Sequence, residues 1–171
     1  MLFKPTIWIQ NVLQIDKLLL YKMHVKGLIL DLDNTLSMHG SPATEIGVAE
    51  WLSDMKNLGI KMMIVSNNTS KRVAPLAREL KIEYIAFGCK PLPFGIHKAV
   101  RILKASGVPQ SQIAIVGDQI FTDVMGGNLY GIKSILVEPF YLESHPGFKL
   151  KRKIENIVFK RDFSYKPVKK H

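Results

Sequence analysis

The sequence contains a single cysteine, Cys89, among 171 residues. One cysteine cannot form an internal disulfide, which excludes the disulfide-stapled class of small domains and is typical of a reducing compartment. We expect Cys89 to be a small buried side chain. The cysteine and histidine spacing of zinc sites is also missing, which excludes a structural zinc domain.

Long hydrophobic runs are lacking too. The longest uncharged apolar stretch near the N-terminus covers residues 5–15, contains Gln10, Asn11 and Gln14, and is too short for a membrane span. It has no small-residue cleavage pattern of a signal peptide. We therefore expect a cytoplasmic protein without a transmembrane helix, with a peripheral position at the inner face of the membrane as the alternative.

Acidic residues are scarce, with 14 Asp and Glu against 24 Lys and Arg, and the net charge is +10. Residues 149–171 hold nine of the basic and two of the acidic residues, so this segment carries +7. We predict a basic C-terminal tail that is either solvated or attracted to an anionic membrane surface. Nucleic acid would attract the same charge, but no recognised binding module occurs, so no specific nucleic acid is expected.

The length and a hydrophobic content of 47% suit one domain, assigned to residues 1–148, with its own core. Apolar runs and helical patterns alternate along it. Predicted strands lie at residues 28–30, 60–65, 83–87, 113–116 and 134–137, and predicted helices at 48–58, 72–80, 93–106 and 123–130. This alternation predicts an α/β three-layer sandwich with a mainly parallel five-stranded sheet.

The first 26 residues allow two interpretations. Trp8, Val12, Ile15 and Leu19 recur at roughly helical spacing, which favours a helix packed on the domain. The alternative is an amphipathic face or extended arm that touches a membrane.

Polar residues follow four of the predicted strands. They are Asp31 and Asp33 after the first strand, Ser66 and Asn67 after the second, Lys90 after the third and Asp118 after the fourth. Because parallel strands end at one edge, we expect these side chains to share a site. Clustered carboxylates suit Mg²⁺, and a lysine, a serine and free backbone N–H groups suit a phosphoryl group. One aspartate can then attack phosphorus while another protonates the leaving oxygen.

The same segments resemble the four motifs of the haloacid dehalogenase (HAD) superfamily of phosphatases. The matching segments are Asp-Leu-Asp-Asn-Thr-Leu at 31–36, Ser-Asn-Asn at 66–68, Lys-Pro at 90–91, and Gly-Asp at 117–118 with Asp123 five residues further on. The resemblance spans about residues 26–138. It implies a Rossmann-like core and an Mg²⁺-dependent phosphomonoester hydrolase.

The resemblance also implies a role for each matching residue. Asp31 is the expected nucleophile, forming an aspartyl-phosphate, and Asp33 the general acid and then base. The expected Mg²⁺ ligands are the side chains of Asp31 and Asp118 and the main-chain carbonyl of Asp33. Ser66, Asn67 and Lys90 are the candidates for holding the substrate, and Asp123 lies near the metal or orients Lys90.

Room for a cap domain is lacking in the chain. Residues 36–44 suffice only for a flap, and residues 68–90 hold one helix and one strand. This arrangement resembles subclass IIIA, and within it the YqeG-type family related to phosphatidylglycerophosphate phosphatases, on residues 4–5, 30–36 and 117–124. An uncapped site suits a substrate that brings its own surface, such as a lipid headgroup.

Three functions therefore stay open. The leading one is hydrolysis of phosphatidylglycerophosphate or a similar bulky anionic substrate at the membrane surface. The others are a phosphatase of a soluble sugar phosphate, nucleotide or phosphoprotein, and a non-catalytic phosphate-binding scaffold. An oligomer in which a neighbouring subunit completes the uncapped site is a further possibility.

Overall fold

Strand β2 (Gly27–Leu30) lies at the centre of the sheet, and all four of its residues are buried. The computed structural model describes residues 2–140. Strand β2 pairs in parallel with β3 (Lys61–Val65) on one side and with β5 (Ile113–Gly117) on the other. A strand in this position is covered on both faces, which is why its sequence is apolar without alternation.

The sheet continues outward to six strands in the order β1-β6-β5-β2-β3-β4, and every pairing is parallel. The outer strands are β4 (Glu83–Ile85), β6 (Lys133–Val137) and β1 (Ile7–Ile9). The parallel α/β sheet is confirmed, but the strand count of five is wrong. Strand β1 has only three residues and pairs with β6, which lies far away in the sequence, so no local pattern marks it.

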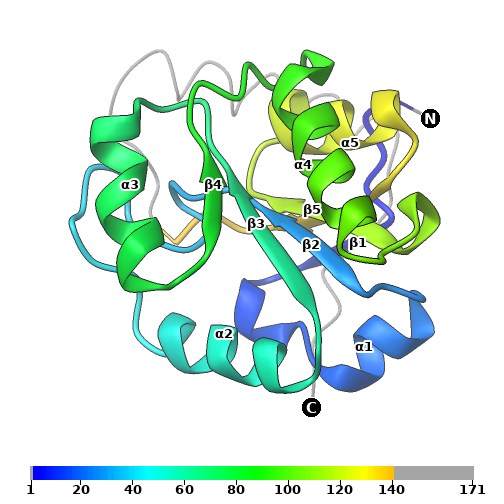
Figure 1. The fold of residues 1–171 in the computed structure, drawn as a ribbon, viewed down its shortest axis with the longest axis horizontal. Coiled ribbons are helices and arrows are strands. Elements are labelled where there is room, and N and C mark those ends of the chain that lie inside the picture. Colours follow the sequence, from blue (N-terminus) through cyan, green and yellow to red (C-terminus); the bar gives the residue numbers. More distant parts are fainter. Residues whose placement is uncertain (1, 141–171) are drawn as a thin grey trace.

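Helices cover both faces of the sheet, as the three-layer prediction requires (Figure 1). They are α1 (Lys17–Lys22), α2 (Val48–Asn57) and α3 (Ser70–Glu79) on one face, and α4 (Pro93–Ala105) and α5 (Met125–Tyr130) on the other. Successive residues of each strand pack against opposite helix layers. Leu28 and Ile64 pack in the core with α2 and α3, whereas Ile29 and Met63 pack with α4.

The N-terminal segment packs on the domain, but not as the single helix that its spacing predicted. It forms β1, a 3₁₀ turn at Val12–Gln14 and the short helix α1. Asp16 breaks the pattern, because its side chain caps α1 by accepting the Leu19 N–H at 2.8 Å. Ile15 is fully buried, and its carbonyl accepts the Trp51 indole N–H at 2.8 Å, which ties this segment to α2.

Helices α2 and α3 end in the same geometry with different residues. After α2, Gly59 adopts φ +76° and the Ile60 N–H donates to the Met55 carbonyl at 3.0 Å. After α3, Lys81 adopts φ +53° and the Ile82 N–H donates to the Ala77 carbonyl at 3.0 Å. These are Schellman ends, which favour glycine at the left-handed position. Within residues 2–140, no helix is both long enough and apolar enough to cross a bilayer.

Candidate active site

The chain turns sharply where it leaves β2. The Asp31 N–H still donates to the Val116 carbonyl of β5 at 2.9 Å, so Asp31 continues the strand. Asn34 then adopts φ +62°, and its N–H donates to the Ser37 carbonyl at 2.7 Å. Asparagine tolerates this left-handed conformation better than most residues. The turn leaves the Asp31 and Asp33 side chains in different surroundings.

The Lys90 ammonium lies between two carboxylates at the carboxyl edge of the sheet. Its Nζ is 2.5 Å from Asp31 Oδ1 and 2.6 Å from Asp123 Oδ1. Carboxylate oxygens of Asp31, Asp118 and Asp123 lie within 4.8 Å of one another, and all three residues are buried. The structure thus brings together residues from three separate segments of the chain, those that contain Asp31, Lys90, and Asp118 with Asp123.

The charges of this cluster do not balance. The cluster holds three buried carboxylates and one ammonium, and the ammonium contacts two of the carboxylates, those of Asp31 and Asp123. Burial raises the pKa of Asp31 to about 6, against the opposing attraction of Lys90. Burial alone would lower the pKa of Lys90, but the attraction of Asp123 and Asp31 raises it above its ordinary value. Lys90 therefore stays charged, and the carboxylates would gain from a further cation.

Asp123 is fixed by its own helix and by a close approach to β5. It lies in a π-helical turn, Ile120–Val124, and its Oδ2 accepts the Gln119 N–H and the Thr122 hydroxyl, both at 3.2 Å. A Cβ atom at Gly117 would lie 2.2 Å from Asp123 Cγ. Only glycine at this strand end lets the Asp123 carboxylate reach Lys90.

Ser66 and Asn67 follow β3, as predicted, but they point to different partners. Ser66 is buried at the strand end, and its Oγ accepts the Asn68 N–H at 3.1 Å. The Asn67 side chain pairs with the backbone of Lys90, donating to its carbonyl at 2.8 Å and accepting its N–H at 2.7 Å. Both polar ends of the Asn67 amide are therefore engaged with the loop that carries Lys90.

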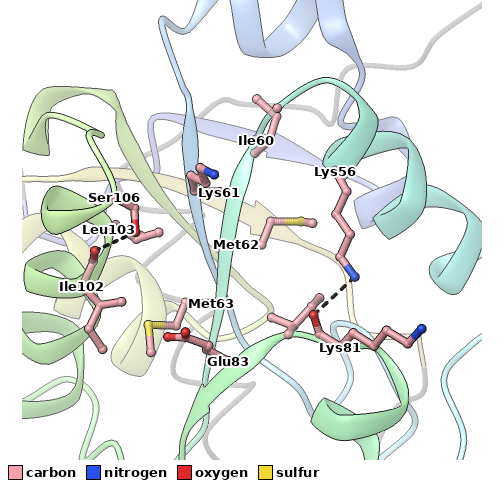
Figure 2. Close-up of a pocket in the computed structure, with 12 residues that line it drawn as sticks. Lys56, Ile60, Lys61, Met62, Met63, Lys81, Glu83, Ile102, Leu103 and Ser106 are labelled. Atoms are coloured by element: carbon pink, nitrogen blue, oxygen red, sulfur yellow. Dashed lines mark hydrogen bonds between the residues drawn. The ribbon is translucent and has the colours of Figure 1, made fainter.

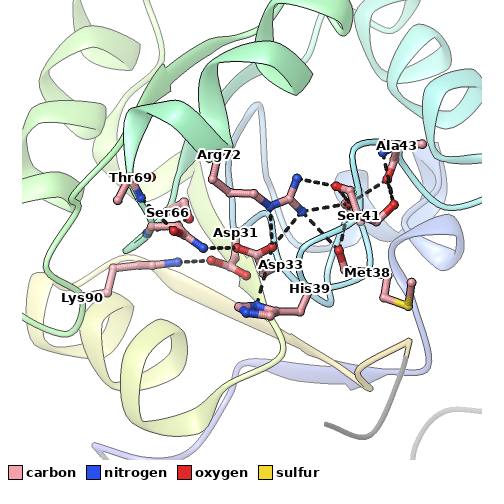
Figure 3. Close-up of polar contacts among 12 residues, drawn as sticks. Asp31, Asp33, Met38, His39, Ser41, Ala43, Ser66, Thr69, Arg72 and Lys90 are labelled. Carbon is pink, nitrogen blue, oxygen red and sulfur yellow. Dashed lines mark hydrogen bonds and ion pairs between the residues drawn. The ribbon is translucent and has the colours of Figure 1, made fainter.

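The Asp33 side chain pairs with Arg72 and Asn68, two residues to which the sequence analysis gave no role. Its Oδ1 is 2.8 Å from Arg72 Nη2, and its Oδ2 accepts the Asn68 Nδ2–H at 3.2 Å (Figure 3). Nothing in the sequence marks Arg72, because an arginine in a helical pattern is ordinary. The His39 side chain is about half exposed, and its Nδ1 lies 3.8 Å from Asp33 Oδ1.

The prediction that Cys89 is buried is wrong, because this residue is exposed. It adopts φ +55°, and its thiol lies 3.3 Å from the Phe87 carbonyl. The loop before Lys90 thus turns its small side chain outward while Lys90 itself points inward.

A hollow of about 360 Å³ lies elsewhere, among the starts of β3 and β4 and the end of α4 (Figure 2). Its lining includes Lys56, Lys61 and Lys81 around the apolar side chains of Met62 and Met63. These strands begin there and end at the carboxylate cluster. The hollow is therefore at the opposite edge of the sheet and contains none of the predicted site residues.

Comparison with known proteins gives consistent matches. The family described as mitochondrial PGP phosphatase matches residues 1–140. The chain is 37% identical over 158 residues to the probable phosphatase YqeG of Bacillus subtilis, covering 91% of this chain and 89% of that protein. It is 27% identical over 147 residues to the chloroplastic phosphatidylglycerophosphate phosphatase 1 of Chlamydomonas reinhardtii, covering 82% of this chain but 55% of that longer protein.

One similar solved structure is 3-deoxy-D-manno-octulosonate 8-phosphate phosphatase from Moraxella catarrhalis, in complex with a magnesium ion, a phosphate ion and a KDO molecule. It has a TM-score of 0.50 and 19% identity, over 85% of this chain and 92% of that chain. At this identity the likeness concerns the fold alone.

A parallel sheet with clustered carboxylates and a buried lysine at its carboxyl edge defines the class of HAD-type phosphatases, which are phosphoric monoester hydrolases. The chain belongs to the PGP phosphatase family of this superfamily and is related to YqeG. The resemblance to the HAD superfamily and to its YqeG-type branch is thereby confirmed.

Proposed function

We propose that this chain is an Mg²⁺-dependent phosphomonoesterase that works through an aspartyl-phosphate on Asp31. The observation that carries the proposal is the Lys90 ammonium held between Asp31 and Asp123, with Asp118 beside them. A nucleophilic carboxylate next to a fixed cation can approach a phosphate anion, because the cation offsets the repulsion between them.

A divalent ion fits the donor set of this cluster. Hard cations prefer carboxylate oxygens, and the cluster offers three buried carboxylates against one ammonium. We propose that the side chains of Asp31 and Asp118 and the main-chain carbonyl of Asp33 hold Mg²⁺. When bound, the ion would neutralise charge on the phosphoryl oxygens. The magnesium ion in the Moraxella phosphatase supports this choice of metal.

The remaining residues divide the reaction between them. An Asp31 oxygen attacks phosphorus, the bond from phosphorus to the leaving oxygen breaks, and Asp33 gives that oxygen a proton. Water then attacks the aspartyl-phosphate, Asp33 takes a proton from the water, and inorganic phosphate leaves. Lys90 and Ser66 hold the phosphoryl group in this proposal. Asn67 acts by fixing the Lys90 backbone, and Asp123 by orienting the Lys90 ammonium.

The surface around Lys90 favours an amphiphilic anionic substrate. Three large apolar side chains near Lys90 in the sequence are well exposed, namely Phe87 at 61% and Leu92 at 56% in the loop and Phe94 at 69% in the first turn of α4. Residues 84–117 contain four Lys and Arg residues and no acidic residue. Exposed apolar groups beside basic ones suit a membrane surface that contains anionic lipids.

The proposed substrate is therefore phosphatidylglycerophosphate or a similar bulky phosphomonoester, reached by peripheral contact with the membrane. The name of the algal relative supports the same substrate. The basic tail at 149–171, which gave the other reason to expect membrane contact, lies outside the described residues. Assembly into an oligomer stays a prediction.

The test is phosphate release from phosphatidylglycerophosphate in anionic vesicles, from a sugar phosphate, from a nucleotide monophosphate and from a phosphopeptide, with and without Mg²⁺. We expect Mg²⁺-dependent release that is fastest with the lipid. Asp31→Asn is expected to form no phosphoenzyme, and Asp33→Asn to lose turnover while still binding metal. Faster turnover of a soluble substrate would replace the lipid assignment, and no turnover of any monoester would favour a phosphate-binding scaffold.

A further inference from the structure

Arg72 joins three segments of the chain around Asp33. It is the third residue of α3, and its side chain is 13% exposed. Its Nε and Nη2 donate to Asp33 Oδ1 at 3.1 and 2.8 Å. The same guanidinium donates to Ser37 Oγ at 3.1 Å, to the Met38 carbonyl at 3.2 Å and to the Ser41 carbonyl (Figure 3). One side chain therefore fixes both the carboxylate and the loop that follows it.

These contacts use most of the donors that Arg72 has. A guanidinium carries five N–H groups, and the contacts to Asp33, Ser37, Met38 and Ser41 engage its Nε and both Nη atoms. A residue that bound substrate phosphate would keep a pair of donors free for it. The geometry thus favours a role in positioning Asp33 over direct substrate binding.

The two oxygens of Asp33 differ as a result. Oδ1 accepts two N–H groups from Arg72, which engages both of its lone-pair directions. Oδ2 accepts one N–H from Asn68, and the Asn68 amide is itself fixed because its Oδ1 accepts the Thr69 N–H at 2.9 Å. A proton on this carboxyl group therefore belongs on Oδ2.

We infer that Arg72 is a positioning residue that orients Asp33 so that Oδ2 carries the proton for the leaving group. This inference rests on the proposed phosphomonoesterase activity, in which Asp33 is the general acid. As the bond between phosphorus and the leaving oxygen breaks, the proton moves from Oδ2 to that oxygen. In the step that forms the aspartyl-phosphate, Arg72 acts through the proton that Asp33 donates, so its importance in that step depends on how much the leaving group needs a proton.

The test compares two substrates of the Mg²⁺-supplemented full chain. p-Nitrophenolate leaves readily without a proton, whereas the alkoxide from glycerol 3-phosphate needs one. We expect Arg72→Ala to lower kcat/KM on glycerol 3-phosphate by ~10–100-fold and on p-nitrophenyl phosphate by less than ~3-fold, since general acid catalysis is worth ~10²–10⁴ in total. The ratio kcat/KM covers only the steps through departure of the leaving group, so hydrolysis of the aspartyl-phosphate, in which Asp33 acts as base, does not enter it. Arg78→Ala, at an exposed arginine of the same helix, is the matched control and should leave both rates unchanged.

A double-mutant cycle separates positioning from a general structural effect. In an Asp33→Asn background, Arg72→Ala should add no further loss on glycerol 3-phosphate, because the group that Arg72 orients is already gone. Arg72→Lys, which keeps the charge without the planar fork, should show the same substrate-selective loss to a smaller extent and serves if Arg72→Ala does not fold.

Equal losses on both substrates, fully additive losses in the cycle, or no loss at all would overturn the role of Arg72 while leaving the proposed function intact. A wild-type chain that hydrolyses neither of these substrates nor any other monoester, the vesicle lipid included, would overturn both.

Discussion

Asn67 and Lys90 are 23 residues apart in the sequence, and the Asn67 side chain holds the Lys90 backbone through two hydrogen bonds of 2.7 and 2.8 Å. The same Lys90 extends its ammonium to Asp31 and Asp123. The loop after β3 therefore sets the position of the lysine that the loop after β4 supplies.

This relationship predicts a double effect of Asn67→Ala. Removing the amide leaves a backbone N–H and carbonyl of the largely buried Lys90 without their partner, which costs about 1–3 kcal/mol for a buried group. We expect a lower free energy of unfolding and a lower kcat on every monoester tested. Urea unfolding and phosphate release measure the two effects. Asn57→Ala, at an exposed asparagine of α2, is the control, and an Asn67 variant indistinguishable from it would contradict the prediction.

Asp31→Asn is predicted to stabilise the metal-free protein while abolishing activity. The folded-state pKa of Asp31 is about 6, above its ordinary value of 3.8, so the folded protein holds this proton more tightly than the unfolded chain. Stability from this group is present at low pH and is lost as the pH rises from about 4 to 6. Above pH 6 we expect the variant to exceed the wild type by about 1–3 kcal/mol.

Chemical unfolding in the presence of a chelator, between pH 4 and 8, measures this difference. Asp54→Asn, at an exposed aspartate of α2, should show no such pH dependence. A wild-type chain that gains stability relative to Asp31→Asn over this pH range would refute the assignment of the buried charge.

Metal binding is predicted to stabilise the wild type and to depend on Asp118. A ligand at ten times its dissociation constant adds about 1.4 kcal/mol to the free energy of unfolding. For a domain of this size, that corresponds to a rise in Tm of about 3–6 °C. Asp118→Asn should lose most of the Mg²⁺-induced rise, whereas Glu79→Gln, at an exposed acid of α3, should keep it. An unchanged rise in Asp118→Asn would remove Asp118 from the metal site.

Lys81→Gly is predicted to stabilise the fold and to leave turnover unchanged. Lys81 occupies a left-handed position after α3, where a side chain costs about 1 kcal/mol that glycine avoids. Gly59 already holds the equivalent position after α2. We expect thermal unfolding to show a higher Tm for Lys81→Gly, a lower Tm for Gly59→Lys, and unchanged turnover for both. A lower Tm for Lys81→Gly would indicate that the Lys81 side chain contributes more than its strain costs.

The sequence predicted the elements whose signal is local. An apolar run that ends in Asp31 specifies a buried strand with its chemistry at the carboxyl end, and the same reasoning placed Lys90 and Asp118 at that edge. Strand β1 was missed because its three residues owe their conformation to pairing with β6. The exposure of Cys89 was missed because it depends on the turn before Lys90.

The sequence alone thus determined the parallel α/β fold and the residues gathered at its carboxyl edge. The alternation of apolar runs and helical patterns is a local property of the sequence, and parallel strands all end at the same edge of a sheet. Only the tertiary structure decided which side chain each of those residues touches. Arg72 reaches Asp33 and Asn67 reaches Lys90 because packing α3 and the two loops against the sheet brings their polar groups within hydrogen-bond distance, and no spacing in the sequence encodes that distance.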